Sequence, residues 1–500
     1  MTYVEYKQLN PFQRFAHNLK RFIVNIPHAI GKFFKTLGKT IVKFFTGIGK
    51  GFKNYGVTFV KGDWATKLSY IIFGVGDLSK GKYYKGILYF LAEVLYILYM
   101  VFFGWGYLKD FGTLGTVETR KVLHPGNIIP KTEYGDNSML ILLYSVLTIV
   151  ITIFVFAIYI SNIKDAYRHQ IMRANGEKPT SLKTDAKQFL DGKYHVTLLS
   201  FPVLMIGIFN ILPLIFMILI AFTNYDKTHL PPGTLFTWVG LDNFYSLFDV
   251  VNSGRKATTF IELTKWTLIW AVLATFTNYI LGMIVALMIN KKGIKFKALW
   301  RTLFVITIAV PQFVSLLVMN QMLQANGAIN VLLSHITGHH VGFQWLNTTG
   351  LIAKTVVIVI NCWVGIPYTI LSMSGILMNI PEDLYESARI DGASPFKTFT
   401  AITLPYMIFV TTPQLITQFV GNINNFNVIY LLTGGGPKTP DFYQAGQTDI
   451  LVTWLFNLTM SSQDYGLAAA IGILVFIVCA TISLIVYNNS KSMKDEEAFS

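Results

Sequence analysis

Residues 381–405 read PEDLYESARIDGASPFKTFTAITLP and separate two long apolar segments of the chain. Asn379 is a candidate N-cap, and Pro381 suits the first position of a short helix at the start of this stretch. Gly392 suits the left-handed residue that ends such a helix. The pattern therefore predicts a first helix that stops at Gly392.

A second short helix is predicted after the glycine. Ser394 and Pro395 are typical of a helix start, and Leu404-Pro405 is expected to close that helix. A compact helix–turn–helix between two membrane segments has few uses, and docking onto a soluble partner is the one we favour. The alternative is an ordinary cytoplasmic loop whose helices are well capped.

The same residues resemble the EAA motif of ABC-importer permeases. That motif is a Glu-small-Ala triplet, then Asp-Gly-Ala, then Ile-x-Leu-Pro, and here the middle of the triplet is Ser387. In that family the loop is a coupling helix that fits a cleft in the ATPase subunit. The resemblance implies that the ATPase-coupling residues are Glu386, Ser387, Ala388, Asp391, Gly392, Ala393 and Pro405.

The composition of the chain is that of a membrane protein. Hydrophobic residues make up 53% and charged residues 13%, whereas roughly 25% of the residues of a soluble domain are charged. Only helices and closed barrels satisfy the backbone in lipid, and alternating barrel strands are absent, so we predict an all-α integral membrane protein. About eight apolar runs are long enough to span a bilayer, namely 86–107, 140–160, 198–222, 266–289, 303–323, 351–377, 406–432 and 466–487.

The orientation of these spans follows from the basic residues. Most of the 41 Lys and Arg residues lie before the first span, in alternate loops and after the last span. The positive-inside rule then places both termini in the cytoplasm, which agrees with an even number of spans. We predict a multi-pass protein of the bacterial plasma membrane.

Four regions follow from the distribution of charge and apolar runs. Residues 1–85 form a basic region in which apolar and lysine residues segregate to opposite faces of a helix, so we expect it to lie on membrane lipids. The alternative is a disordered basic tail. Two additional transmembrane helices occupy 86–197, a six-helix permease core occupies 198–488, and a cytoplasmic tail occupies 489–500.

The middles of the core spans contain no Asp, Glu, Lys, Arg or His. An ion-coupled secondary transporter usually needs buried ionisable groups, so this alternative is disfavoured and an external energy source is expected. No catalytic constellation is present, and we predict that the chain is not an enzyme. His335, His339 and His340 cluster in an outer loop without Cys or a nearby carboxylate, so we predict no metal site.

Uncharged polar residues concentrate in the sixth and seventh spans. Gln414, Gln418, Asn422 and Asn425 are spaced so that they share one face of a helix. Amides and aromatic rings suit a neutral polyhydroxylated ligand, although inter-helix hydrogen bonding explains the same pattern equally well. The residues Gly365, Pro367 and Pro413 further suggest broken helices near the middle of the membrane.

Several stretches resemble the MalF-type subunit of maltose/maltodextrin importers. They are residues 361–405, NINNFNVIYLLTGGGP at 422–437, AGQTDILV at 445–452, DYGLAAAI at 464–471 and the outer-loop signature WVGLDNF at 238–244. In that family, sugar contacts the helices on both sides of the coupling loop. Gln418 and Asn427 stand where the family type has other residues. The substrate-binding residues implied by the resemblance are Asn361, Val364, Gly365, Tyr368, Gln418, Asn422, Asn425 and Asn427.

The resemblance also implies a set of partners. We expect a second, MalG-like permease subunit, two ABC ATPase subunits that bind ATP and Mg, and an extracellular sugar-binding lipoprotein. This chain itself is expected to hold no cofactor and to bind no nucleic acid. The expected substrate is a maltodextrin-class sugar, with a raffinose-type oligosaccharide or a polyol as the alternative.

Overall fold

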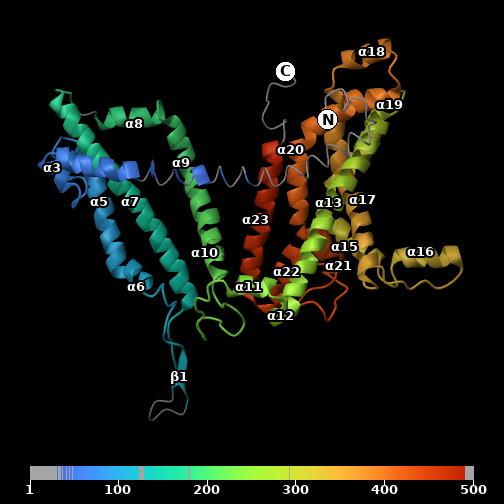
Figure 1. The fold of residues 1–500 in the computed structure, drawn as a ribbon, viewed down its shortest axis with the longest axis horizontal. Helices are drawn as coiled ribbons and strands as arrows, with labels where there is room; N and C mark the ends of the chain where they lie inside the picture. Colours follow the sequence, from blue (N-terminus) through green and yellow to red (C-terminus); the bar gives the residue numbers. More distant parts are fainter. Residues whose placement is uncertain are drawn as a thin grey trace. The chain divides into compact units, whose positions relative to one another are not determined.

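The computed structural model describes residues 49–122, 129–177, 181–291 and 293–489, with isolated positions between 31 and 47. The chain divides into two compact units, and each is described by itself. We call Thr36–Asn243 with Asp464–Ala469 the N-terminal unit, and Phe244–Gln463 with Ala470–Ser500 the main part of the C-terminal unit. Figure 1 shows that both units are built almost entirely from helices.

The predicted all-α membrane architecture is confirmed. In the described residues, seven helices are long and apolar enough to cross a membrane, and a bent pair makes up to eight. The bent pair corresponds to the predicted fifth span, which is broken by a bend of 86°. The seven helices are Tyr83–Leu108, Ser138–Ala174, Tyr194–Ile220, Arg255–Asn290, Gly350–Met378, Pro395–Thr433 and Tyr465–Tyr487.

In the N-terminal unit, the long helix α7 (Ser138–Ala174) packs against α5 (Tyr83–Tyr99), α6 (Trp105–Leu108) and α10 (Leu212–Ile220). A two-stranded antiparallel hairpin projects beyond the helix ends (Figure 1). The remaining elements of this unit are α3 (Trp64–Leu68), α4 (Val75–Leu78), η1 (Met100–Gly104), β1 (Arg120–Val122), β2 (Lys131–Glu133), α8 (Leu182–Leu190), α9 (Tyr194–Ile206) and η2 (Gly207–Ile211).

A buried polar network holds α3 and α4 against α7. The Lys80 ammonium is almost completely buried and donates to the Thr66 hydroxyl at 2.7 Å and to the Ala166 carbonyl at 3.0 Å. On the same side of α7, His169 Nδ1 lies 2.6 Å from the buried Asp77 carboxylate. A buried charge is costly unless it is paired and hydrogen-bonded, so this network ties the segment to α7.

The C-terminal unit is organised around α13 (Arg255–Asn290), which packs most extensively against α17 (Gly350–Met378) and also against α20 (Leu404–Ile423). Its other elements are α12 (Val250–Ser253), α14 (Lys297–Ala309), α15 (Gln312–Met322), α16 (Ala328–Thr337), α18 (Glu382–Ile390), α19 (Pro395–Thr398), η3 (Phe399–Thr403), α21 (Phe426–Thr433), α22 (Leu451–Asn457) and η4 (Leu458–Ser462). Two further helices, α11 (Asp242–Phe248) and α23 (Tyr465–Asn489), have most of their residues in this unit and their first residues in the N-terminal unit.

Close approach of α13 and α17 depends on two glycines. A Cβ at Gly282 would lie 2.5 Å from the Thr369 Cβ, and a Cβ at Gly365 would lie 2.3 Å from the Asn278 side chain. Gly282 of α13 therefore faces Thr369 of α17, and Gly365 of α17 faces Asn278 of α13. Such pairs let membrane helices approach closely, because packing drives their association in lipid.

Two regional expectations concern the third span and residues 1–85. The helices α9 and α10 form the predicted third span, which we assigned to the permease core; by contact they cluster with the N-terminal unit, and α10 packs on α7. The apolar face predicted within residues 1–85 lies outside the described residues. Lys35, Lys39 and Lys43 are described, and all three are helical and exposed.

The loop between α21 and α22 contains a buried carboxylate, Asp449. Its Oδ2 accepts from the Gly446 N–H at 2.8 Å and from Asn457 Nδ2 at 3.3 Å, and its Oδ1 has no partner among the described residues. Burial raises the pKa of Asp449 from 3.8 to about 6. The folded loop therefore binds a proton more tightly than the unfolded chain does.

We expect the stability of this loop to depend on pH in the acidic range. The stabilisation by the bound proton is complete below the unfolded pKa and is lost as the pH rises through about 6. Its size is on the order of 3 kcal/mol. Thermal unfolding measured between pH 4 and 7 should show this loss in the wild type and not in Asp449→Asn.

Asp441 provides the matched control, because it lies in the same loop and is exposed. Asp441→Asn should keep the wild-type pH profile. Parallel pH profiles for wild type and Asp449→Asn would contradict the assignment.

Candidate functional site

The loop at 381–405 forms a short helix closed by a glycine turn. Gly392 has a φ of +69° and follows Asp391, the C-cap of α18. The N–H of Gly392 donates to the Arg389 carbonyl at 3.1 Å, and the N–H of Ala393 donates to the Ala388 carbonyl at 2.9 Å. These two bonds form a Schellman motif with Gly392 at the left-handed position, as predicted.

The start of the second helix also agrees with the prediction. The Ser394 hydroxyl accepts from the Lys397 N–H at 3.3 Å, and Pro395 is the first residue of α19. Two details of the prediction are wrong. Asn379 ends α17 instead of capping α18, and Pro381 is itself the N-cap residue of α18.

The prediction that Leu404-Pro405 closes the second helix is also wrong. The chain continues from α19 through the π-helical turn η3 into α20. The Leu404 N–H bonds to the Phe399 carbonyl, five residues back. Pro405, which lacks an N–H, follows directly on this π-helical turn as the second residue of α20.

The helix α18 presents an exposed apolar surface at one end of the C-terminal unit, away from α21 and α22 (Figure 1). Ile390 and Leu384 of α18 are 86% and 43% exposed, and Phe396 of α19 is 69% exposed. Of the predicted coupling residues, Glu386, Ser387, Asp391, Gly392 and Pro405 are exposed, whereas Ala388 and Ala393 are half-buried. Exposed apolar residues among charged ones are typical of a protein-docking surface.

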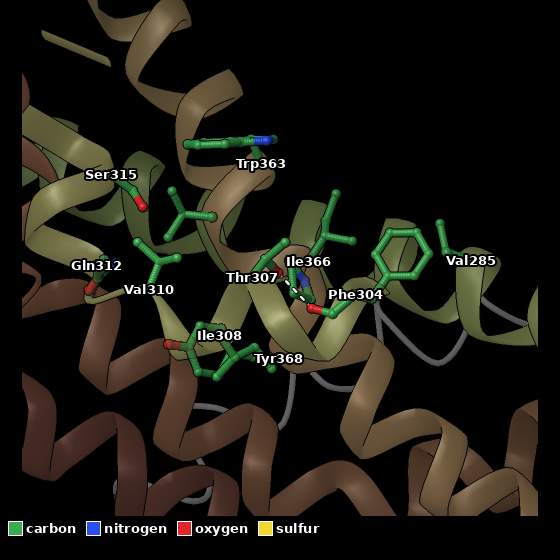
Figure 2. A pocket seen from close by; sticks show the side chains of 12 residues that line it. Val285, Phe304, Thr307, Ile308, Val310, Gln312, Ser315, Trp363, Ile366 and Tyr368 are labelled. Carbon is green, nitrogen blue, oxygen red and sulfur yellow. Dashed lines mark hydrogen bonds between the residues drawn. The ribbon is translucent and has the colours of Figure 1, made fainter. Parts of the chain in front are cut away.

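A second feature is a cavity of about 460 Å³ where the fifth span is broken. Figure 2 shows its lining side chains, which come from α13, α14, α15 and α17. Its volume lies within the range of small-molecule sites. The lining residues are Val285, Phe304, Thr307, Ile308, Val310, Gln312, Ser315, Trp363, Val364, Ile366, Pro367 and Tyr368.

The break that opens this cavity lies at Val310-Pro311. Val310 adopts an extended ψ of 122°, as expected of a residue before proline, and α15 begins at Gln312. No side chain caps the start of α15, and the Val314 N–H of the first turn bonds to the Pro311 carbonyl at 3.0 Å. Gln312 and Ser315 from this first turn line the cavity.

The sequence predicted broken helices at other prolines. Pro367 lies inside the continuous helix α17, and Pro413 lies inside the continuous helix α20. Both helices pack along α13, which supports them through the missing hydrogen bond. In contrast, α14 packs mainly on α17 while α15 packs mainly on α21, so the two halves of the fifth span follow different neighbours.

The chemistry of the cavity is neutral. It has three aromatic rings, from Phe304, Trp363 and Tyr368, and amide or hydroxyl groups from Gln312 and Ser315. Among the described residues that line it, none is charged. Rings that stack and uncharged groups that both donate and accept hydrogen bonds suit a polyhydroxylated molecule without charge.

The predicted sugar contacts on α17 fall on two faces. Val364 and Tyr368 line the cavity, and Tyr368 is 49% exposed. Asn361 is buried, and Gly365 lies against Asn278 of α13. Among the described residues, Asn361 Nδ2 and Asn278 Oδ1 have no hydrogen-bond partner, which is uncommon for buried amides.

The predicted contacts beyond the coupling loop do not share one helical face, because α20 ends at Ile423 and Asn425 caps the next helix. Asn425 Oδ1 accepts from the Val428 N–H at 3.3 Å. Asn422 is buried, and its Nδ2 donates to Thr275 of α13 at 2.9 Å. Gln418 is half-buried and Asn427 is exposed, and neither lines the cavity.

Sequence reasoning missed Phe304, Gln312, Ser315 and Trp363 as cavity residues. The signal that could have found them is Pro311, a proline in the middle of an apolar run. It predicts a broken span, and broken spans often place polar groups at a transport site.

Comparison with known proteins gives matches over most of the chain. Residues 278–495 match the family described as binding-protein-dependent transport system inner membrane component. The galactooligosaccharides transport system permease protein GanP of Bacillus subtilis is 35% identical, over 85% of this chain and 97% of GanP. The maltodextrin transport system permease protein MdxF of Bacillus subtilis is 33% identical, over 85% of this chain and 95% of MdxF.

A solved structure is also similar. It is the crystal structure of a bacterial ABC transporter involved in the import of the acidic polysaccharide alginate. The matched chain has a TM-score of 0.50 and 25% sequence identity, with 62% of this chain and 98% of that chain covered.

Proposed function

This chain belongs to the MalF-type family of binding-protein-dependent sugar permeases, and from that premise we propose that it conducts maltodextrin-class oligosaccharides through the cavity beside Pro311. At the coarser level, it is a multi-pass transmembrane permease subunit of an oligosaccharide ABC importer. The proposal concerns the sugar, the path and the partners.

The observation that carries the proposal is the uncharged aromatic and amide lining of the cavity. Val364 and Tyr368, which the resemblance assigns to sugar, line it together with Trp363 and Gln312. A charged substrate would leave its charge without a partner in this lining.

The mechanism that we propose is alternating access driven from outside the chain. A sugar-binding lipoprotein delivers the sugar on the outer face, and two ATPase subunits bind ATP and Mg in the cytoplasm. Their closure moves α18. The Tyr385 hydroxyl of α18 lies 2.9 Å from the Thr403 hydroxyl, directly before α20, and so links the movement of α18 to α20. A second, MalG-like permease subunit completes the path, the plasma membrane is the site, and both termini are cytoplasmic.

A second candidate substrate is a galacto-oligosaccharide. The observation that favours it is the 35% identity to GanP, which is slightly above the 33% identity to MdxF. Both substrates are neutral hexose oligomers, and the cavity chemistry suits either one.

Uptake of radiolabelled maltotriose in a deletion strain, complemented with this chain and its partners, tests the proposal. Unlabelled maltodextrins should compete fully, and galacto-oligosaccharides, raffinose and a polyol should compete weakly. Stronger competition by galacto-oligosaccharides would transfer the assignment to that class. Uptake that persists in proteoliposomes without ATPase subunits would instead indicate an ion-coupled carrier.

A further inference from the structure

An apolar groove of about 430 Å³ lies in the N-terminal unit. It runs between the helical segment 49–61 and α7, and the transport function described above does not use it. We call it the α7 groove. Its lining residues are Gly51, Phe52, Asn54, Tyr55, Thr58, Phe156, Tyr159, Ile160, Ile163 and Lys164.

The α7 groove ends at the level where α7 leaves the hydrocarbon layer. No charged residue occurs in α7 from Ser138 to Ile163, and Lys164 is the first. At 1.5 Å per residue, Lys164 lies roughly 39 Å along the helix from Ser138, whereas the hydrocarbon core is about 30 Å thick. The Lys164 ammonium is therefore placed among lipid headgroups, with the apolar part of the groove on the hydrocarbon side.

The two walls of the groove are held together. On α7 the lining residues recur every three or four positions, so they form one stripe of the helix. The Tyr55 and Tyr159 hydroxyls lie 2.7 Å apart and join the two walls. The Tyr70 hydroxyl donates to the Tyr55 carbonyl at 2.7 Å, which anchors segment 49–61 a second time.

The charge around the groove is positive. Segment 49–61 contains Lys50, Lys53 and Lys61 and no acidic residue. Lys164 is exposed, and in the part of the chain that the structure describes no ion pair includes it. The neighbouring Asp165 carboxylate is instead paired with Lys85.

We propose that the α7 groove binds one membrane phospholipid with an anionic headgroup. An acyl chain lies along the apolar stripe of α7, and the phosphate lies against Lys164. The apolar lining, the position of Lys164 at headgroup depth and the excess of lysine all match this ligand. A zwitterionic lipid satisfies only the first of these features.

Groove-filling variants test the apolar part of the site. A Cβ at Gly51 or at Gly56 meets no atom within 4 Å, so both helical positions accept a side chain without a clash. Gly51 lines the groove and Gly56 does not. Native mass spectrometry of the assembled transporter, reconstituted with phosphatidylglycerol and extracted in detergent, should show a retained lipid in wild type and Gly56→Phe and none in Gly51→Phe.

Charge variants test the headgroup part. Lys164→Gln should weaken phosphatidylglycerol retention about fivefold, because one lysine near an anionic surface contributes that much. Lys53→Gln, on segment 49–61 and outside the lining, should have a smaller effect. Phosphatidylcholine should be retained less than phosphatidylglycerol by the wild type, and soluble glycerol phosphate should not compete.

Each arm has an outcome that overturns the proposal. Equal retention by Gly51→Phe and Gly56→Phe would place the lipid elsewhere. Equal retention of phosphatidylcholine and phosphatidylglycerol, or equal effects of the two lysine variants, would remove the anionic headgroup from Lys164. Displacement by glycerol phosphate would show a phosphate site without an acyl-chain requirement.

Discussion

Gly392→Val is expected to abolish sugar uptake while the permease stays in the membrane. Gly392 holds a φ of +69° at the turn that closes α18. A left-handed conformation costs a β-branched residue roughly 1–2 kcal/mol or more, so valine should open the two hydrogen bonds of the turn. The exposed surface of α18 would then lose its orientation, and the ATPase subunits should no longer copurify.

Two variants separate backbone strain from side-chain bulk. Asparagine tolerates the left-handed region, so Gly392→Asn should retain most of the uptake. Gly375→Val adds the same side chain in α17, where a Cβ meets nothing within 4 Å and φ is ordinary, and it should transport normally. A purified Gly392→Val complex that couples ATP hydrolysis to normal transport would show that this turn does not hold the ATPase.

Tyr368→Ala is expected to lower maltodextrin uptake per assembled complex by roughly tenfold or more, since removing one bonded partner costs about 1–3 kcal/mol. The Tyr368 ring and hydroxyl lie at the wall of the cavity (Figure 2). A half-exposed side chain contributes little to packing, so assembly and thermal stability should be nearly unchanged. Uptake of labelled maltotriose, divided by the amount of complex recovered, measures the effect.

Tyr487→Ala is the matched control for this loss. Tyr487 on α23 is 48% exposed, close to the 49% of Tyr368, and it does not line the cavity. Its replacement should leave uptake per complex at the wild-type value. Equal losses in both variants would mean that removal of any exposed tyrosine impairs transport.

Asn422→Ala should give the opposite pattern to Tyr368→Ala. Its buried amide joins α20 to Thr275 of α13, so its loss should lower thermal stability while uptake per surviving complex is maintained. Wild-type uptake per complex in Tyr368→Ala would place the sugar path elsewhere. Lost uptake per complex in Asn422→Ala would place Asn422 on that path, as the resemblance implies.

The sequence by itself determined the membrane architecture and the turn at Gly392. An apolar run must be long enough to cross a bilayer wherever it packs, so its length and composition are sufficient to identify it. The turn is similarly local: a glycine at the left-handed position and a serine before Pro395 suffice for both helix ends. These features depend on neighbours within a few residues along the chain.

Only the tertiary structure decided which helix faces which. Pro311 breaks its span while Pro367 does not, because α14 and α15 follow different neighbours and α17 follows α13 throughout. Lys80 is buried because α7, more than eighty residues away, supplies the Ala166 carbonyl. Whether a proline kinks, a lysine is buried or an amide joins two helices depends on groups that are distant in sequence, and pattern and spacing do not encode those distances.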